Sequence, residues 1–293
     1  MCEVRFAKKN EIERVKEIWK LCFADSDRDI YAYFTCRYKA DETVVLLQEG
    51  VIVAMLTLIS ANMVTADKRS FPCAMFYAIA THSLYRNRGF SSRIMEFSNQ
   101  YLQSKGCDIS VLVPAEKQLY SFYYKQGYKD GFYIREVSLL RDRIDGLPSQ
   151  STLNLTFLSA VPEDYNRLRN KLLEGRLFIA YDDADIAYQK KLSRLSGTDI
   201  YVISCERVLG CAILERATPK RVFIKELLLP DALVNAAVKQ IKQSVVAEEY
   251  ILRTPAYASE HLGGSVRPFG IYKAGNAQRI SSEELGYMGL ALD

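Results

Sequence analysis

The chain has 293 residues, of which 49% are hydrophobic and 25% charged, and its net charge is +4. This composition is typical of a globular protein of about two domains and excludes a disordered or fibrous chain. No stretch reaches the roughly 18 apolar residues of a membrane span, and basic residues are spread among acidic ones, which argues against nucleic acid as the principal ligand.

The cysteines and histidines limit the metal and redox chemistry. The seven cysteines are scattered and never spaced as Cys-x-x-Cys, which is expected of reduced thiols in the cytoplasm. His82 and His261 are the only histidines, which excludes a histidine-based metal cage. The charged start, Met1 to Arg5, is unlike a signal peptide. We therefore expect a cytoplasmic protein without a metal.

The first 40 residues predict a strand and two helices. The strand covers 2–8, and Asn10 and Glu13 are spaced as a capping box for the first helix. Ser26 and Asp29 are spaced as the cap of the second helix, whose aromatic side chains are Tyr31, Tyr33, Phe34 and Tyr38.

A hairpin follows, and then a compact series of alternating elements. Residues 43–48 and 51–60 predict two strands that turn at Glu49-Gly50. The next elements are a strand, a helix, a strand and a short helix, at 73–81, 92–105, 107–113 and 115–126. Gly106 and Gly127 end the two helices.

The segment Arg86-Asn87-Arg88-Gly89-Phe90-Ser91 joins the strand at 73–81 to the following helix. A turn that opens a helix directs several backbone N–H groups to one side, at the positive end of the helix dipole. Gly89 lets the backbone approach an anion closely, and Arg86, Arg88 and Arg93 keep their charge at physiological pH. The segment therefore predicts a pyrophosphate-binding loop.

Two motifs in this region resemble those of the GNAT superfamily of acyl-CoA-dependent N-acetyltransferases. Arg86-x-x-Gly89-x-Ser91 resembles the family's pyrophosphate loop, although Ser91 stands where glycine or alanine is usual. Phe122 to Tyr128 resembles the motif that closes the family's domain. The resemblance covers residues 1–140 and implies an α/β (α+β) fold whose mixed, mostly antiparallel central sheet is flanked by helices.

The resemblance also implies the cofactor and several site residues. Acetyl-CoA would be the co-substrate, with no metal. Its pyrophosphate would bind Arg86, Asn87, Arg88, Gly89, Phe90 and Ser91, and its pantetheine and thioester carbonyl would lie along Ala80, Thr81 and His82. Tyr123 stands at the position of the family's general acid, which protonates the CoA sulfur.

The general base stays open. His82 has a suitable ordinary pKa, but a structural role at the strand end is the favoured interpretation. The strand at 71–81 carries no glutamate, where many members of the superfamily place a base. The chain also resembles the enhanced intracellular survival family of acetyltransferases, which pairs a catalytic with a degenerate GNAT unit and uses a terminal carboxylate as base. A carboxylate at Asp293 is the corresponding candidate here.

The second half of the chain repeats the element pattern. A linker is predicted at 141–151. After it, the sequence predicts a strand at 153–158, a helix at 162–174, a hairpin of two strands at 200–204 and 208–214, a strand at 222–229 and a helix at 231–246. At the strand-to-helix junction Leu229-Pro230-Asp231 there is neither glycine nor arginine, and Asp231 would repel a pyrophosphate. We therefore expect a catalytic GNAT domain at 1–145 and a degenerate GNAT-like domain at 152–293.

The predicted function is transfer of an acetyl group from acetyl-CoA to a primary amine of a small molecule or a protein. An alternative is a non-catalytic acyl-CoA-binding regulatory module, which the missing base favours and the Tyr123 motif opposes. A tRNA-dependent aminoacyltransferase with tandem GNAT domains is a third interpretation, but no heptad run predicts its helical arm. No membrane or nucleic-acid partner is expected. The acceptor, the acyl chain preference and the oligomeric state stay open.

Overall fold

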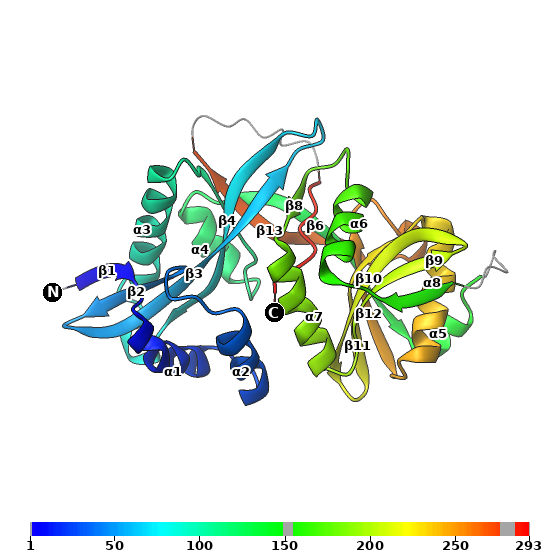
Figure 1. Cartoon of the computed structure of the whole chain (residues 1–293), viewed down its shortest axis with the longest axis horizontal. Helices are drawn as coiled ribbons and strands as arrows, with labels where there is room; N and C mark the ends of the chain where they lie inside the picture. Colours follow the sequence, from blue (N-terminus) through cyan, green and yellow to red (C-terminus); the bar gives the residue numbers. More distant parts are fainter. Residues whose placement is uncertain (1, 149–154, 276–284, 293) are drawn as a thin grey trace. The chain divides into compact units, whose positions relative to one another are not determined.

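Figure 1 shows the computed structural model, which describes residues 2–148, 155–275 and 285–292. The chain divides into two compact units. Unit 1 comprises Met1–Met63, Ser70–Lys129 and Gly270–Ile280, and unit 2 comprises Val64–Arg69, Asp130–Phe269 and Ser281–Asp293. Each unit is described separately below.

Unit 1 is built on a mixed sheet with the strand order β1-β2-β3-β4-β5-β13. Its strands are β1 (Cys2–Phe6), β2 (Thr43–Gln48), β3 (Val51–Val64), β4 (Ser70–Thr81), β5 (Ile109–Leu112) and the second half of β13 (Ser265–Ala274). Its helices are α1 (Ile12–Cys22), α2 (Asp27–Cys36), α3 (Phe90–Ser104) and α4 (Leu119–Lys125), with short 3-10 turns at η1 (Lys9–Glu11) and η2 (Ser83–Tyr85). The pairs β1–β2, β2–β3 and β5–β13 are antiparallel, and β4–β5 is parallel.

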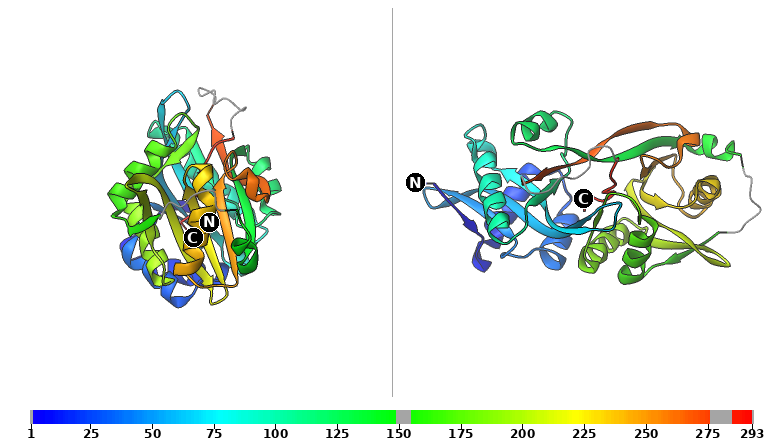
Figure 2. Two further views of the ribbon diagram at one scale, coloured as in Figure 1. Left: turned by 90° about the vertical axis from the view of Figure 1, so that its right-hand side faces the viewer. Right: turned by 90° about the horizontal axis from the view of Figure 1, so that it is seen from above.

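Alternation along the strands gives this sheet two apolar faces. Leu56 and Leu58 of β3 pack in one buried cluster with Ile94 of α3 and Tyr123 of α4. The intervening Thr57 lies on the other face, where its hydroxyl is 3.2 Å from that of Tyr33 in α2. Helices therefore cover both faces of the sheet (Figure 2).

Several local predictions for unit 1 are confirmed. The Ser26 hydroxyl accepts a hydrogen bond from the Asp29 N–H at 3.2 Å and caps α2. The hairpin between β2 and β3 turns at Glu49 and Gly50, both with positive φ. Gly106 and Gly127 adopt positive φ directly after α3 and α4. In each case a local rule of backbone conformation decided the structure.

The predicted capping box of Asn10 and Glu13 is wrong. No side chain caps α1, because the 3-10 turn η1 precedes it and brings Glu11 to the cap position. The Glu11 carboxylate accepts hydrogen bonds from the Lys8 N–H at 2.7 Å and from the Arg5 guanidinium at 2.6 Å. Glu13 instead forms an exposed ion pair with Lys16.

Unit 2 has the strand order β13-β6-β12-β11-β10-β9-β7. Its strands are β6 (Lys129–Leu140), β7 (Thr156–Ser159), β8 (Phe178–Ala180), β9 (Ile200–Cys205), β10 (Arg207–Thr218), β11 (Arg221–Leu228), β12 (Glu249–Pro255) and the first half of β13. Its helices are α5 (Arg141–Asp145), α6 (Pro162–Leu172), α7 (Asp183–Leu195) and α8 (Asp231–Ser244), with a 3-10 turn at η3 (Glu260–Leu262). A buried cluster joins α8, including Val238 and Ile241, to Ile224 of β11 and Leu252 of β12.

Most elements predicted for unit 2 are present, and one assignment is wrong. The predicted linker at 141–151 contains α5, because Ile144 is fully buried in the core and the Arg141 N–H bonds to the Glu248 carbonyl at 2.9 Å. Positions 149–151 lie outside the described residues. The strands β6, β8, β12 and β13 and helix α7 were not predicted.

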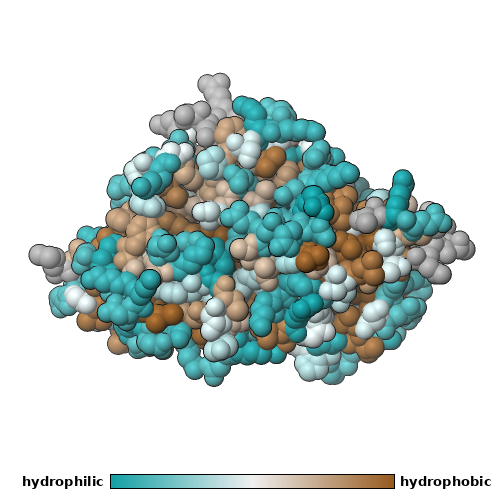
Figure 3. Space-filling view, viewed as in Figure 1, coloured by the Kyte–Doolittle hydropathy of each residue, from teal (hydrophilic) through white to brown (hydrophobic). Residues whose placement is uncertain are grey.

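The predicted fold class is confirmed, since the strand pairs of each unit are mixed and mostly antiparallel and helices flank the strands. The domain ranges 1–145 and 152–293 stay a prediction; the compact units interleave along the chain, because β13 contributes residues to each. No helix in the described part of the chain combines the length and apolar character needed to cross a membrane. Hydrophilic and hydrophobic residues are intermixed on the face drawn in Figure 3.

Candidate functional site

The loop between β4 and α3 has the backbone of an anion-binding turn. Asn87 and Gly89 both adopt left-handed φ, 62° and 74°, and Gly89 directly precedes α3. A Cβ added at Gly89 would have no heavy atom within 4 Å, apart from those of the adjacent residues. The first bond of the helix joins the Arg93 N–H to the Gly89 carbonyl at 3.1 Å. The N–H groups of the preceding turn therefore have no acceptor within the helix and point out of its N-terminus.

Arginine side chains surround this turn. Arg86, Arg88 and Arg93 are all exposed. The Arg86 guanidinium donates to the Thr81 carbonyl at 3.3 Å, and that of Arg88 lies over the Tyr85 ring at 5.3 Å. The charges of Arg86 and Arg88 are thus held near the helix start by contacts with neighbouring residues, where they would attract phosphate oxygens.

The end of β4 is coupled to the loop. The Thr81 hydroxyl lies 3.1 Å from the Ser91 hydroxyl, Ala80 is buried, and the His82 N–H bonds to the Val53 carbonyl at 2.9 Å. These contacts tie the predicted residues at the end of β4, 80–82, to the start of α3, where the predicted loop 86–91 ends.

Strands β4 and β5 pair over only a short length. Their register runs from Cys73 opposite Ile109 to Met75 opposite Val111, whereas β4 continues to Thr81. Ala78, beyond the part of β4 that pairs with β5, has a left-handed φ of 50°, a conformation that is uncommon outside glycine and concentrates at functional sites. The pairing of β4 with β5 thus ends six residues before β4 does.

Tyr123 is a buried residue of α4. Its side chain on α4 is only 7% exposed, and burial raises the pKa of the phenol to about 12. Its hydroxyl has no hydrogen-bond partner among the described residues, while its ring packs against that of Tyr128, with centroids 6.0 Å apart. The neighbouring Tyr124 is 43% exposed, so the two side chains point in different directions, as predicted.

Helix α4 is attached to the start of α3. The Gln126 side-chain amide donates to the Ser92 hydroxyl at 3.0 Å, and the Lys273 ammonium donates to the Gln126 carbonyl at 2.9 Å. These contacts fix the helix that carries Tyr123 relative to the anion-binding turn.

The side chain of His82 caps the short turn η2, and the structure assigns no residue as the general base. Its Nδ1 accepts a hydrogen bond from the Leu84 N–H at 3.3 Å and caps η2. Asp293, the other candidate, lies outside the described residues.

Two further contacts of this region could not be predicted from any sequence pattern. The Cys22 thiol at the end of α1 donates to the Thr81 carbonyl at 3.3 Å and lies 3.7 Å from an Arg86 nitrogen. Trp19 and Tyr77 join the predicted aromatic residues of α2 in one cluster, with ring centroids 4.3 Å apart for Trp19–Tyr33 and 5.7 Å for Trp19–Tyr77. Tyr31, in contrast, is largely exposed.

The corresponding junction in unit 2 differs. Asp231 is the first residue of α8, and its carboxylate accepts a hydrogen bond from the Ser259 N–H at 2.9 Å. A negative charge thus occupies the helix start where unit 1 has its glycine turn.

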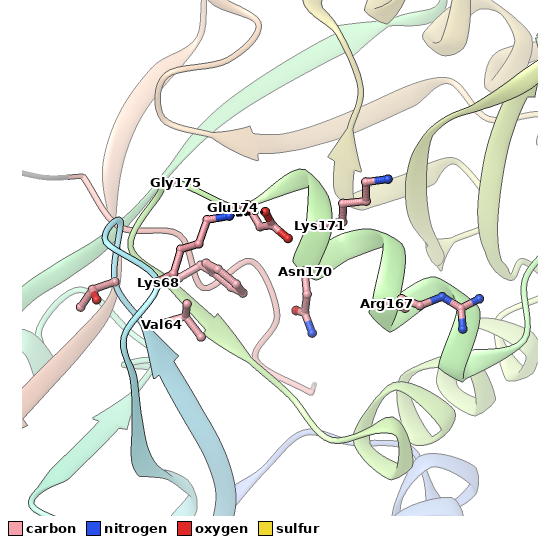
Figure 4. Close-up of a pocket in the computed structure, with 9 residues that line it drawn as sticks. Val64, Lys68, Arg167, Asn170, Lys171, Glu174 and Gly175 are labelled. Atoms are coloured by element: carbon pink, nitrogen blue, oxygen red, sulfur yellow. Dashed lines mark hydrogen bonds and ion pairs between the residues drawn. The ribbon is translucent and has the colours of Figure 1, made fainter.

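Unit 2 also contains a pocket of about 480 Å³. In Figure 4 the Lys68 ammonium faces the Glu174 carboxylate, at 2.9 Å, while Arg167 and Lys171 point away from this pair. None of the predicted site residues lines the pocket. The described part of the chain contains no cluster of three metal-ligating side chains.

A glycine turn at a helix start with arginine charge around it is suited to bind the phosphate groups of a ligand. In agreement, residues 3–130 match the family described as "Acetyltransferase (GNAT) domain". Residues 3–130 are therefore an acetyltransferase domain of the GNAT type. GNAT domains use acetyl-CoA as co-substrate. No curated protein sequence matches the chain.

Solved structures share the fold at low sequence identity. A GCN5-related N-acetyltransferase from Anabaena variabilis is 17% identical with a TM-score of 0.74, covering 93% of this chain and 72% of its own. Eis1 from Mycobacterium abscessus is 12% identical with a TM-score of 0.69, covering 94% and 73%. A putative acetyltransferase from Pyrococcus horikoshii is 14% identical with a TM-score of 0.61, covering 98% and 94%. At these identities the similarities show a shared fold.

Proposed function

We propose that the protein transfers an acetyl group from acetyl-CoA to a primary amine of a small molecule or a protein, by direct attack of the amine on the thioester. The observation that carries this proposal is the left-handed Asn87–Gly89 turn at the start of α3, with unpaired N–H groups and three arginines around it. Such a turn binds a pyrophosphate through backbone donors and charge.

Different residues of this site bind different parts of acetyl-CoA. Arg86, Asn87, Arg88, Gly89, Phe90 and Ser91 hold the pyrophosphate, and the main chain of Ala80, Thr81 and His82 binds the pantetheine and the thioester carbonyl. Main-chain N–H groups directed at the carbonyl oxygen stabilise the negative charge that develops there during attack.

Tyr123 acts as the general acid. Its hydroxyl carries a proton at neutral pH, because burial raises its pKa to about 12, and no described residue competes for that proton. It donates the proton to the departing CoA sulfur. A carboxylate at Asp293 removes a proton from the attacking amine, and deletion of Leu292 and Asp293 tests this role, because full activity of the shortened chain excludes it.

Only unit 1 binds the cofactor in this proposal. The Asp231 carboxylate at the start of α8 supports it, because a fixed negative charge repels a pyrophosphate. The proposed setting is the cytoplasm, with neither nucleic acid nor a membrane as partner, as the scattered thiols and mixed surface charge suggest.

The test measures acetyl-CoA binding by calorimetry for the unaltered protein, Gly89→Glu and Gly106→Glu. Both glycines flank α3, both have a φ near 75°, and both have open space around a Cβ, so the two substitutions impose similar backbone strain. Only Gly89→Glu places a carboxylate at the anion-binding turn. We expect binding to be lost in Gly89→Glu and retained in Gly106→Glu.

Release of CoA is followed in the same samples over a panel of small amines and amine-bearing peptides. Turnover on one of them identifies the acceptor class. Equal binding by both variants would refute the assignment of the loop, and binding without turnover on any amine would refute the proposed transfer.

A further inference from the structure

The sheet of unit 1 is completed by a strand from late in the chain. Residues 271–274 of β13 pair antiparallel with β5, which places Ile271 opposite Leu112. This strand lies outside the matched acetyltransferase domain at 3–130. Ile271 is fully buried in the same apolar cluster as Tyr123. The core around the proposed general acid is therefore built in part by a segment that the matched domain does not contain.

Lys273 of this strand contacts the end of α4. Its ammonium donates to the main-chain carbonyl of Gln126 at 2.9 Å, although 147 positions separate the two residues. A Cβ at Gly127 would lie 3.6 Å from Cε of Lys273, so the lysine stem passes directly over the glycine that follows the helix. Among the described residues Lys273 has no carboxylate partner, and its charge is held on the Gln126 carbonyl.

The Gln126 side chain makes a second contact. Its amide donates to the Ser92 hydroxyl at 3.0 Å, in the first turn of α3 and directly after the predicted loop 86–91. The Gln126 N–H donates to the Tyr123 carbonyl at 2.9 Å. Gln126 is thus bonded to β13, to α3 and to the main chain of Tyr123. We call Lys273, Gln126 and Ser92 the α4 clamp.

The position of the Tyr123 hydroxyl depends on that of the α4 backbone. Helix α4 has seven residues and no side chain caps its start, and a helix of this length is not stable by itself. The ring of Tyr123 packs against other aromatic rings, and its hydroxyl has no hydrogen-bond partner among the described residues. Because no bond holds the hydroxyl directly, the contacts that fix α4 also place the hydroxyl.

We propose that Lys273 is a positioning residue for the general acid, supplied by β13 from outside the matched domain. Its bond to Gln126 fixes the last turn of α4, and with it the Tyr123 hydroxyl, relative to the anion-binding turn. The inference rests on the proposed function, in which Tyr123 protonates the CoA sulfur. Proton transfer requires donor and acceptor to lie about 2.6–3.2 Å apart, so a small shift of α4 lowers turnover and leaves CoA binding intact.

The test compares Lys273→Met with Lys129→Met in the full chain. Methionine retains an unbranched stem over Gly127 and removes the ammonium. Lys129 is the matched control, because its ammonium lies over the Tyr272 ring of β13, at 4.9 Å from the centroid, and forms no hydrogen bond with α4 among the described residues. Amide hydrogen exchange of residues 119–128 is measured together with kcat, the KM for acetyl-CoA and denaturant unfolding.

We expect Lys273→Met to accelerate exchange in residues 119–128 and to lower kcat by about tenfold, the effect of about one charge-assisted hydrogen bond, with KM unchanged within about twofold. Lys129→Met leaves exchange and kcat unchanged. Lys273→Arg, which retains a charged donor, recovers most of the turnover. In the Tyr123→Phe background Lys273→Met causes no further loss of kcat, because both changes act through one hydroxyl.

Faster exchange with unchanged kcat would overturn the positioning role, and so would independent losses of kcat in the double variant. Unchanged exchange would overturn the α4 clamp itself. A loss of stability or of acetyl-CoA affinity as large as that of kcat would make Lys273 a structural residue and would also overturn the proposal.

Failure of the proposed function is recognised separately. If Tyr123→Phe retains full turnover, the general acid is refuted and the positioning role of Lys273 with it. If the unaltered protein acetylates no amine, the proposed function is refuted, and the exchange measurement still decides whether Lys273 fixes α4.

Discussion

Replacing Tyr123 with phenylalanine removes one hydroxyl from the proposed site and retains the ring. The ring packs against Phe122 and Tyr128 in the core of unit 1, with centroids 5.1 and 6.0 Å apart. The hydroxyl has no hydrogen-bond partner among the described residues. Its loss leaves no buried group unsatisfied, and we expect the free energy of unfolding to change by less than about 0.5 kcal/mol.

Turnover should respond much more strongly than stability. A positioned general acid contributes about 10²- to 10⁴-fold, so we expect kcat to fall by at least about 100-fold, or about 2.7 kcal/mol in activation free energy. The affinity for CoA should stay within about twofold, because the anion-binding turn is unchanged. The pKa of about 12 further predicts that loss of the Tyr123 proton causes no decline of kcat in the unaltered enzyme below about pH 11.

The assay combines steady-state CoA release, CoA titration calorimetry and chemical denaturation. Tyr124→Phe is the matched control, since it removes a hydroxyl from the adjacent, exposed ring of the same helix. A Tyr123→Phe variant with the turnover of the control would refute the role of Tyr123. A similar loss of CoA affinity and stability would show instead that the residue is structural.

Two further predictions concern stability. Gly289→Ala should destabilise unit 2 by about 1–3 kcal/mol more than Gly197→Ala in denaturant unfolding, because both glycines have a positive φ but only at Gly289 would a Cβ collide with neighbouring atoms; equal effects would contradict the close fit of Gly289 against Glu226. The hydrogen bond from Arg5, opposed by burial, lowers the pKa of Glu11 below its ordinary value of 4.5. The ionised Glu11 carboxylate therefore contributes its full stabilisation above about pH 4.5, and this stabilisation is lost as the pH falls through the pKa of Glu11 in the folded protein. Denaturant unfolding across this range should show a smaller acid-induced loss for Arg5→Met than for the unaltered protein, and identical pH curves would contradict this linkage.

Features that depend on neighbouring residues were predictable from the sequence. The turn at Glu49-Gly50 and the helix ends at Gly106 and Gly127 follow from the freedom of glycine at positive φ. The anion-binding turn followed from an apolar strand, a glycine and an amphipathic helix in immediate succession. Because these signals act over a few residues, the sequence was sufficient to predict the order of elements from β1 to α4 and the candidate cofactor site.

Features that depend on distant residues were decided only by the tertiary structure. Burial of Ile144 turns part of the predicted linker into α5, and the Cys22 thiol meets Thr81 although 59 positions separate them. Arg169 and Glu226 read in the sequence as ordinary charged residues, and only folding brings them together and onto the Met288 carbonyl. The physical reason is that burial and hydrogen-bond partners are set by the packing of whole elements, which leaves no periodic pattern in the segments that meet.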